Sequence, residues 1–349
     1  MGDDVYALRV TRESARAENL VGRVLCHDLR TVDGQIALAK GRVLDTEDVA
    51  LALSLAWAEA HLLALDAGDV HENDAGTRVA RAAAGDGIDV REVSGGHWPL
   101  VASHRGLLEI DTSVLERVNA LDGPCVYTLL DGQVVERGEI VARAKIIPFA
   151  VPEQVVADVE AMARPTGIVR VRPFAPQRVG SVVHEQMGER AVTRFRDAVT
   201  EKLAWFGSSL CALELTASSA DAIVAALTRA RDAGSVVLLV AGTKAMDVLD
   251  PTFAALDRVG ARMVRHGVPA HPGSLLWLAD WGGIPVVGMP TCGLFAQATV
   301  FDLVISRALA GARVDRLELA RLGHGGFLTR AMAFRLPAYR ATAERGAVE

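Results

Sequence analysis

Cysteine is scarce in this 349-residue sequence: only four occur, and no two of them are spaced as a CxxC pair. Neither a disulfide framework nor a zinc site is therefore expected, and the usage fits a reducing compartment. Basic residues are also few, since 37 Lys and Arg stand against 43 Asp and Glu, for a formal net charge of −6. This balance argues against a nucleic acid or an anionic membrane surface as partner.

Long apolar runs and targeting signals are missing as well. No stretch approaches the roughly 20 apolar residues that cross a bilayer. The start, MGDDVYALRV, has neither the basic head nor the apolar core of a signal peptide. We therefore expect a soluble, cytoplasmic protein. What is present is Ala, Val, Leu and Gly, with half of the residues apolar and 5% aromatic, which favours packed α/β layers in two domains.

Residues 1–150 are expected to form a strand-rich α+β domain. Asp45 opens a helix, because an acidic cap there precedes apolar residues spaced four apart. AEAHLLAL predicts a short strand, and VHENDAGTRVARAAAG predicts a helix that ends at Gly85. Apolar and polar residues alternate around Asp131 and Gly132, which predicts a β-hairpin that turns at this pair.

The pattern changes in the second half of the sequence. Residues 151–165 predict a linker helix, and over residues 166–312 strands alternate with helices. The strands are apolar without interruption, as in VGSVVH, SLCALEL, VVLLVA and IPVVGMP. Such a sequence predicts an α/β domain whose mostly parallel sheet is covered on both faces. Residues 313–349 are expected to be a C-terminal tail.

Two carboxylates follow the strand VVLLVA. The strand breaks at Gly242, and Asp247 and Asp250 come next, with Asp250 directly before Pro251 as the cap of a helix. Ligands of parallel sheets lie outside the carboxyl ends of the strands, and Mg²⁺ commonly takes one or two carboxylates together with ligand oxygens. The pair predicts a site for a phosphorylated ligand and a divalent cation. The alternative is a plain helix cap at Asp250 and a solvated loop acid at Asp247.

Neighbouring loops offer groups for an anion. Gly242 and Thr243 suit a phosphate cradle, because a glycine lets the backbone approach an anion closely, and Lys244 adds a positive charge. Ser218 and Ser219 could donate to the same anion at the start of another helix. Each group has an ordinary alternative: a strand-ending turn for the glycine, an exposed loop lysine, and helix capping for the serines.

Two tight turns follow further along the chain. Pro272, Gly273 and Ser274 form one, and residues 290–293 form a strand-to-helix turn that contains Cys292. A nucleophilic cysteine needs a base beside it, and the local sequence offers none, so an inert thiol is favoured.

The stretch from about residue 179 to residue 311 resembles the molybdopterin-binding domain shared by the MoeA, MogA and MoaB proteins of molybdenum cofactor biosynthesis. The motifs that carry the resemblance are VAGTKAMDVLD, RHGVPAHPG and GMPTCG. FDLVISRALAG followed by LARLGHGGF, with ARAKIIPF upstream, is similar to a MoeA-related subgroup. The resemblance extends over most of the chain and is most specific over residues 236–311.

This resemblance implies a three-layer α/β fold and insertion of molybdate into molybdopterin, through an adenylylated intermediate and with Mg²⁺. It implies that Asp247 and Asp250 are the catalytic and metal-binding residues. Relatives of this kind are often dimers or trimers, so a homo-oligomer is expected. The residues and the resemblance together give these candidates for cofactor binding: Gly242, Thr243, Lys244, Ser218, Ser219, Glu185, Pro272, Gly273, Ser274, Gly288, Pro290 and Thr291.

The sequence also departs from the family pattern. Thr243 replaces the second glycine of the cradle, residues 291–293 (TCG) stand in place of GNP, and residues 184–186 (HEQ) stand near the usual TGDE. Three hypotheses stay open: a MoeA-like protein that binds molybdopterin or its adenylylated form and inserts molybdate, a non-catalytic carrier or sensor of the cofactor, and a CinA-like hydrolase of a nucleotide pyrophosphate. The first two imply other cofactor-assembly proteins or a molybdoenzyme as partners.

Overall fold

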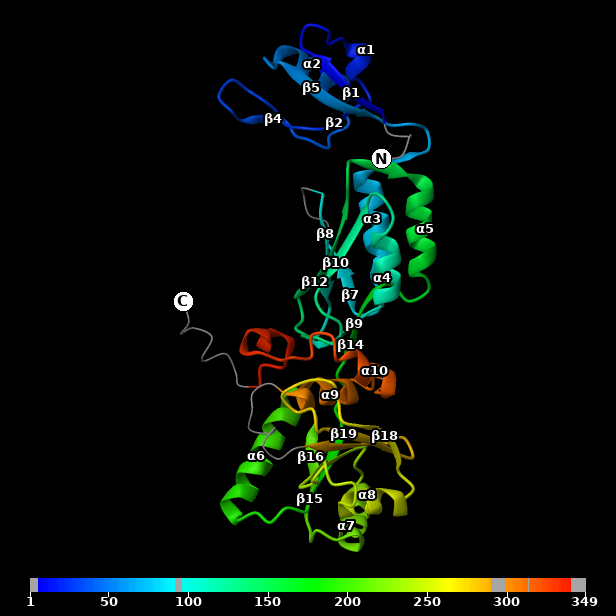
Figure 1. The fold of residues 1–349 in the computed structure, drawn as a ribbon. Helices are drawn as coiled ribbons and strands as arrows, with labels where there is room; N and C mark the ends of the chain where they lie inside the picture. Colours follow the sequence, from blue (N-terminus) through cyan, green and yellow to red (C-terminus); the bar gives the residue numbers. More distant parts are fainter. Residues whose placement is uncertain (1–5, 92–95, 290–298, 313, 340–349) are drawn as a thin grey trace. The chain divides into compact units, whose positions relative to one another are not determined.

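A computed structural model describes residues 6–91, 96–289, 299–312 and 314–339 of the chain, whose helices and strands are traced in Figure 1. Their contacts define two compact units. Unit 1 consists of Met1–His104, Glu109–Asp131 and Glu136–Val171, and unit 2 consists of Arg105–Leu108, Gly132–Val135 and Arg172–Glu349. Within the described residues, no helix combines the length and the apolarity that a membrane crossing requires.

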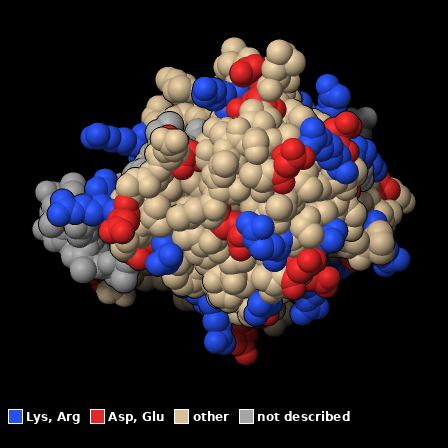
Figure 2. Space-filling view, turned by 90° about the horizontal axis from the view of Figure 1, so that it is seen from below, with Lys and Arg blue, Asp and Glu red and all other residues tan. Residues whose placement is uncertain are grey.

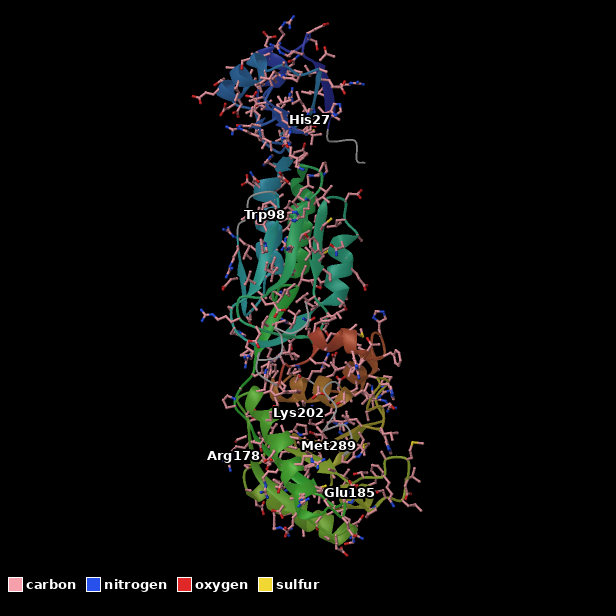
Figure 3. The ribbon with its side chains drawn as sticks, turned by 90° about the vertical axis from the view of Figure 1, so that its left-hand side faces the viewer. His27, Trp98, Arg178, Glu185, Lys202 and Met289 are labelled. Atoms are coloured by element: carbon pink, nitrogen blue, oxygen red, sulfur yellow. The ribbon has the colours of Figure 1, made fainter. Side chains whose placement is uncertain are left out.

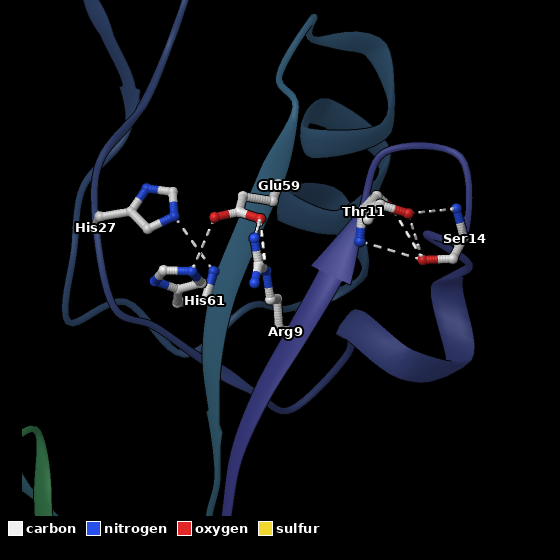
Figure 4. A network of polar contacts seen from close by, with 6 residues as sticks. All are labelled: Arg9, Thr11, Ser14, His27, Glu59 and His61. Carbon is white, nitrogen blue, oxygen red and sulfur yellow. Dashed lines mark hydrogen bonds and ion pairs between the residues drawn. The ribbon is translucent and has the colours of Figure 1, made fainter.

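Unit 1 begins with a small antiparallel sheet in the order β1-β5-β2. On this sheet Glu59 accepts a hydrogen bond from Arg9 and contacts the ring of His61, whose backbone N–H donates to His27, as Figure 4 shows. The helix predicted from Asp45 is confirmed, because the Asp45 carboxylate accepts the Asp48 N–H at 2.8 Å. The elements are β1 (Tyr6–Thr11), α1 (Ala17–Leu20), β2 (Val24–Leu25), β3 (Leu29–Arg30), β4 (Ile36–Leu38), α2 (Thr46–Ser54) and β5 (Glu59–Ala64).

The rest of unit 1 contains a four-stranded antiparallel sheet, β10-β12-β8-β7, with helices packed on it, and a separate two-stranded sheet, β13-β6. Arg78 joins two of these helices, α3 and α5, by ion pairs to Glu153 and Glu160. The elements are β6 (Asp69–His71), α3 (Glu72–Ala83), β7 (Ile88–Val90), β8 (Trp98–Ala102), α4 (Thr112–Asn119), β10 (Pro124–Thr128), β12 (Ile140–Ile146), β13 (Ala150–Pro152) and α5 (Glu153–Ala163). The helix predicted over residues 151–165 is thus α5.

The hairpin predicted around Asp131 and Gly132 has a longer connection than a two-residue turn. The strand before this pair, β10, pairs with β12, whereas the strand after it, β11 (Val134–Val135), pairs with β9 (Gly106–Ile110). A two-residue hairpin of the type expected from Asp-Gly needs positive φ at both central residues. Only Gly132 has it, at +72°. β10 and β12 thus pair antiparallel on either side of Asp131 and Gly132, through a connection that includes β11.

Unit 2 contains the predicted α/β sheet, in the order β16-β15-β17-β20-β19-β18. The first four strands are parallel, and β19 and β18 are antiparallel to their neighbours. The mostly parallel sheet is therefore confirmed. The elements are β15 (Arg178–Val183), α6 (Glu189–Trp205), β16 (Ser209–Leu215), α7 (Ala220–Asp232), β17 (Val237–Ala241), α8 (Pro251–Arg258), β18 (Arg262–His266), β19 (Trp277–Trp281), β20 (Ile284–Met289) and α9 (Val300–Leu309).

Two apolar cores, one on each face of this sheet, make the unit three-layered. Successive residues of β17 alternate between them: Leu239 packs with the side chains of α6 and α9, whereas Leu238 and Val240 pack with those of α7 and α8. A strand buried on both faces has no polar side, which is why its sequence is apolar throughout. The helix α6, which connects β15 to β16, lies on one face, and the helix α7, which connects β16 to β17, lies on the other.

The strand order fixes where a ligand site can form. From β15 the chain moves to β16 on one side and then to β17 on the other side. The loops that leave neighbouring strands therefore diverge to opposite faces at the carboxyl ends of β15 and β17. Ligands of open α/β sheets bind in the crevice at such a point. Figure 3 labels Arg178, the first residue of β15, and Glu185, which lies two residues beyond the last residue of β15 at this carboxyl end.

The described residues after α9 belong to the core of unit 2. They contain α10 (Arg316–Arg321) and the 3₁₀ helix η2 (Arg330–Arg335), and the side chains of Leu319, Leu328 and Leu336 are buried in the core beside α6 and α9. The described part of the stretch predicted as a tail, residues 314–339, therefore supplies core residues.

A buried ion pair fixes the last described residue of this stretch. Lys202 of α6 lies 2.5 Å from the carboxylate of Asp302, which also accepts a hydrogen bond from the Tyr339 hydroxyl at 2.8 Å. Burial and the neighbouring Asp302 charge raise the pKa of Tyr339 well above its ordinary value. The phenol is therefore a permanent donor that anchors the C-terminal segment to α9.

Candidate functional site

A buried histidine stands at the carboxyl end of β15, where the strand order favours a ligand. His184 is 4% exposed, and its ring lies between two hydroxyl-bearing loops. Its Nδ1 atom is 3.1 Å from Oγ of Ser218, which follows β16. Its Nε2 atom is 3.0 Å from Oγ1 of Thr252 in α8 and 3.5 Å from Oγ1 of Thr243. One imidazole thus connects the segments that follow β16 and β17.

The environment of His184 keeps this imidazole neutral. Burial lowers the pKa of His184, and the charges of Asp250 and Glu185 offset that effect only in part. A neutral imidazole has one N–H donor and one nitrogen acceptor, and both ring nitrogens have a hydroxyl partner here. The ring is therefore held in place by hydrogen bonds that need no charge.

Asp250 holds the loop that follows β17. Its Oδ1 accepts the backbone N–H of Thr252, and its Oδ2 accepts the backbone N–H of Lys244, both at 2.9 Å. The residue is 3% exposed and is the N-cap of α8, with Pro251 as the first helical residue. Burial alone would raise the pKa of Asp250, but these hydrogen bonds and that of the Thr252 side chain outweigh it, so the pKa lies below its usual value.

Asp247 is in a different environment from Asp250. It is exposed in the loop, and its Oδ1 accepts the N–H of Leu249 at 3.0 Å. The structure therefore separates the predicted pair into a buried, fully engaged carboxylate and a solvent-facing one. The catalytic and metal-binding roles of both residues stay predictions.

The other groups of this loop face solvent around Asp247. Lys244 is exposed, and so are the apolar side chains of Met246, Val248 and Leu249, which are 79%, 78% and 86% exposed. Large apolar side chains at this exposure contribute nothing to the core of the unit. The loop therefore presents a cation, a carboxylate and an apolar surface together.

Gly242 is where this loop leaves the sheet. Its φ is +104°, and a Cβ at this position would lie 2.8 Å from the backbone nitrogen of Glu185. Both facts require glycine. Other residues avoid this φ, and their Cβ would lie too close to the backbone of Glu185. The close approach of the loop to the end of β15 is a sufficient structural reason for the residue. Its predicted role in a phosphate cradle stays a prediction.

Ser218, Ser219 and Glu185 lie at the same edge of the sheet. Ser219 caps α7 by accepting the Ala222 N–H at 3.4 Å, whereas the exposed Ser218 contacts His184 instead. Glu185 is exposed directly after His184. Helix capping therefore explains the side-chain contact of Ser219, whereas the side-chain partner of Ser218 is His184.

The predicted turn at Pro272, Gly273 and Ser274 contacts another part of the unit. The carbonyl of Pro272 accepts the Val300 N–H of α9 at 2.9 Å, and a Cβ on Gly273 would lie 3.2 Å from Cβ of Val300. Ser274 accepts the N–H of Val268 through its backbone carbonyl. These contacts join the turn to the start of α9 and do not include the His184 cluster.

Gly288 of β20 has a packing role. A Cβ there would lie 1.9 Å from Cε2 of Trp277, its cross-strand partner on β19. The indole therefore occupies the space that a side chain would take. Pro290 and Thr291, the next predicted positions, lie outside the described residues.

A groove of about 370 Å³ borders the loop after β17, within the size range of small-molecule sites. The ring of His266 lies 4.8 Å from that of Phe253 at its wall, and Nε2 of His266 is 2.6 Å from the Ala245 carbonyl oxygen. The loop is thus held by Asp250 at its end and by His266 near its middle. The groove is lined by Val248, Phe253, Leu256, Asp257, Ala261, Met263 and His266.

Surface charge on the face shown in Figure 2 is mixed. Lys and Arg side chains are interspersed with Asp and Glu, and neither sign forms a continuous area there. Attraction of an anion to this face would accordingly depend on particular groups rather than on a continuous field.

Sequence reasoning missed the residue at the centre of the cluster. It named the neighbouring Glu185 for ligand binding, and it gave His184 and Thr252 no role. A histidine at the end of an apolar strand was the available signal. Its partners come from segments 34 and 68 residues away, so their convergence is visible only in the fold.

No family model matches this chain, and no curated protein matches it. Among solved structures it is similar to the molybdopterin biosynthesis MoeA protein of Pyrococcus horikosii, with 13% identity and a TM-score of 0.32 over 69% of this chain and 79% of that one. It is also similar to a molybdenum cofactor biosynthesis protein of Pyrococcus furiosus, with 15% identity and a TM-score of 0.25 over 88% and 65%.

A third similar structure is the CinA protein of Thermoplasma acidophilum, described as of unknown function, with 12% identity and a TM-score of 0.24 over 33% of this chain and 89% of that one. Likenesses this distant do not carry an activity from one protein to another, because one fold serves many functions.

Proposed function

We propose that this protein binds molybdopterin, free or adenylylated, at the carboxyl ends of β15, β16 and β17, and acts in molybdenum cofactor assembly. The proposal rests on the motif resemblance of residues 236–311 and on one structural observation. Asp250 anchors the loop after β17 through two backbone hydrogen bonds, and the loop then presents Lys244 and Asp247 to solvent. A pre-formed loop binds a ligand without first having to be ordered.

In this proposal the phosphate of the pterin lies against the edge of the sheet. Lys244 supplies a charge-assisted hydrogen bond to a phosphate oxygen. Ser218 and Ser219 stand at the start of α7, where the unpaired N–H groups of the first helical turn favour an anion. Gly242 keeps the loop close to the end of β15, so that these groups face one ligand.

The two aspartates fit a divalent cation unequally. Both carboxylate oxygens of Asp250 already accept backbone N–H groups, so Asp250 fits a positioning role. Asp247 is exposed, and it is the residue that would hold Mg²⁺ together with phosphate oxygens. When bound, the cation would supply positive charge against the phosphate. Molybdate is then the second substrate if the protein is an enzyme.

A titration with purified molybdopterin, followed by its fluorescence with and without Mg²⁺, tests the binding. Lys244→Ala is expected to weaken binding about tenfold or more, because a hydrogen bond to a charged group contributes about 1.5–3 kcal/mol. Lys40→Ala is the matched control, since Lys40 is an exposed lysine of unit 1. Absence of binding by the wild-type protein, or equal affinity in the two variants, would contradict the proposal.

Asp247→Asn distinguishes an enzyme from a carrier. The variant keeps the side-chain shape and one oxygen but loses the charge that a cation needs. Loss of molybdate insertion with molybdopterin binding retained supports insertion by this protein. Insertion and binding that are both unchanged support a carrier that presents the cofactor to another protein.

A further inference from the structure

The cluster around His184 has the arrangement of an activated nucleophile. Ser218 is exposed, and its hydroxyl oxygen lies 3.1 Å from Nδ1 of the buried imidazole. On the other side of the ring, Nε2 lies 3.0 Å from the Thr252 hydroxyl. A nucleophile within about 2.6–3.2 Å of a base, with the base oriented by a third group, is the arrangement that activates a serine.

Helix capping does not account for this contact. The cap of α7 is the next residue, Ser219, and the Ser218 side chain is not needed for it. The third group is itself fixed, since the Thr252 hydroxyl lies 3.1 Å from that of Thr243 and its backbone N–H is bound by Asp250. Ser218 is the exposed hydroxyl of this cluster, since Thr252 is buried and Thr243 is half-buried. It lies beside His184 at the carboxyl end of β15, where the strand order favours a ligand.

We propose that Ser218 is a catalytic nucleophile toward a phosphoanhydride, with His184 as its general base and Thr252 as the positioning residue. His184 then takes the tautomer that is protonated at Nε2, donates this hydrogen to Thr252, and accepts the Ser218 proton at Nδ1. A phosphorus electrophile suits this place better than a carbonyl, because the first turn of α7 and Lys244 offer donors and positive charge for phosphate oxygens at the same edge.

The reaction balances with water as the only co-substrate. Oγ of Ser218 attacks phosphorus, its proton moves to Nδ1 of His184, and the bond from phosphorus to the bridging oxygen breaks. The leaving phosphate oxygen takes the proton from His184. Water then attacks the phosphoserine, giving one proton to His184, and the bond from Oγ to phosphorus breaks as Ser218 regains its proton.

A fluorophosphonate tests this reactivity without any pterin, so its result is independent of the binding proposed above. Attack by Oγ forms an oxygen–phosphorus bond and releases fluoride, and the adduct is read by intact mass and peptide mapping of the full chain. We expect one adduct, at Ser218. Ser218→Ala abolishes it, and Ser209→Ala, at the opposite, amino-terminal end of β16, leaves the labelling rate unchanged.

The base is tested by the rate of labelling. His184→Gln is expected to slow labelling about a hundredfold or more, the usual size of a general-base contribution. In the wild-type protein the rate should fall as pH decreases through the pKa of His184, since protonation removes the acceptor. Asp250 and Glu185 are the charged groups that act on this ring, and Thr252→Val should slow labelling and move the midpoint.

Two results would overturn the proposal. One is a wild-type protein whose Ser218 stays unlabelled, which needs no variant to interpret. The other is labelling at Ser218 with the same rate and pH profile in His184→Gln, which would show an exposed serine without a base.

Discussion

Replacement of Asp250 tests whether this carboxylate holds the loop after β17. Asp250→Ala removes the cap of α8, which costs about 1 kcal/mol, and leaves the partly buried Lys244 N–H without its acceptor, which costs about 1–3 kcal/mol. The expected loss is therefore about 2–4 kcal/mol. Asp247→Ala is the matched control in the same loop, and its exposed carboxylate should change stability by about 0.5 kcal/mol or less.

Amide hydrogen exchange of α8 measures this loss locally, with the amides of α7 as the internal reference. A loss of 2–4 kcal/mol accelerates exchange in α8 by about 30-fold or more, at tenfold per 1.4 kcal/mol. Asp250→Asn should lie between wild type and Asp250→Ala, because its amide keeps one oxygen acceptor. Equal exchange in Asp250→Ala and Asp247→Ala would refute the structural role assigned to Asp250.

The same carboxylate predicts a pH dependence. The pKa of Asp250 is lowered in the folded protein relative to the ordinary value of 3.8, so its ionised form stabilises the fold. This contribution is fully present above about pH 4 and is lost as pH falls through the lowered pKa. In Asp250→Asn the acid-induced part of the exchange increase in α8 should be smaller than in wild type, and an identical pH profile would contradict the assignment.

Three further predictions concern packing and charge. Gly288→Ala should destabilise unit 2 by about 1–3 kcal/mol, because its Cβ would overlap the indole of Trp277; urea unfolding followed by tryptophan fluorescence measures this. Gly188→Ala is the control, since a Cβ there has nothing within 4 Å. Similar losses in the two variants would argue against the overlap. Lys202→Met leaves the fully buried Asp302 charge without its cation, so a loss of about 3–5 kcal/mol is expected in the same assay, and a change below about 1 kcal/mol would contradict a buried pair. Arg78→Ala removes the guanidinium that joins α3 to two glutamates of α5. The expected loss of about 1 kcal/mol of unfolding free energy should shrink in high salt. A loss that does not depend on salt would point to packing instead of charge.

Local signals in the sequence were sufficient for most of unit 2. The starts of α7 and α8 follow from Ser219 and from Asp250 with Pro251, because capping depends on residues two or three positions apart. The parallel strands follow from their uninterrupted apolar runs. Local signals failed where pairing was at issue. The alternation around Asp131 and Gly132 did not reveal that β11, directly after this pair, pairs with β9, and β19, which reverses the direction of the sheet, was not foreseen.

The candidate site likewise combines residues that the sequence predicts with contacts that only the fold shows. The sequence by itself determined which loops end the strands and that they carry Gly242, Lys244 and Asp247, since these follow from strand periodicity and from the rule that sites form at carboxyl ends. Only the tertiary structure decided that Asp250 is buried beneath the loop and that Ser218 meets His184. Capping acts between near neighbours in sequence, whereas a hydrogen bond across 34 residues depends on the order in which the strands assemble.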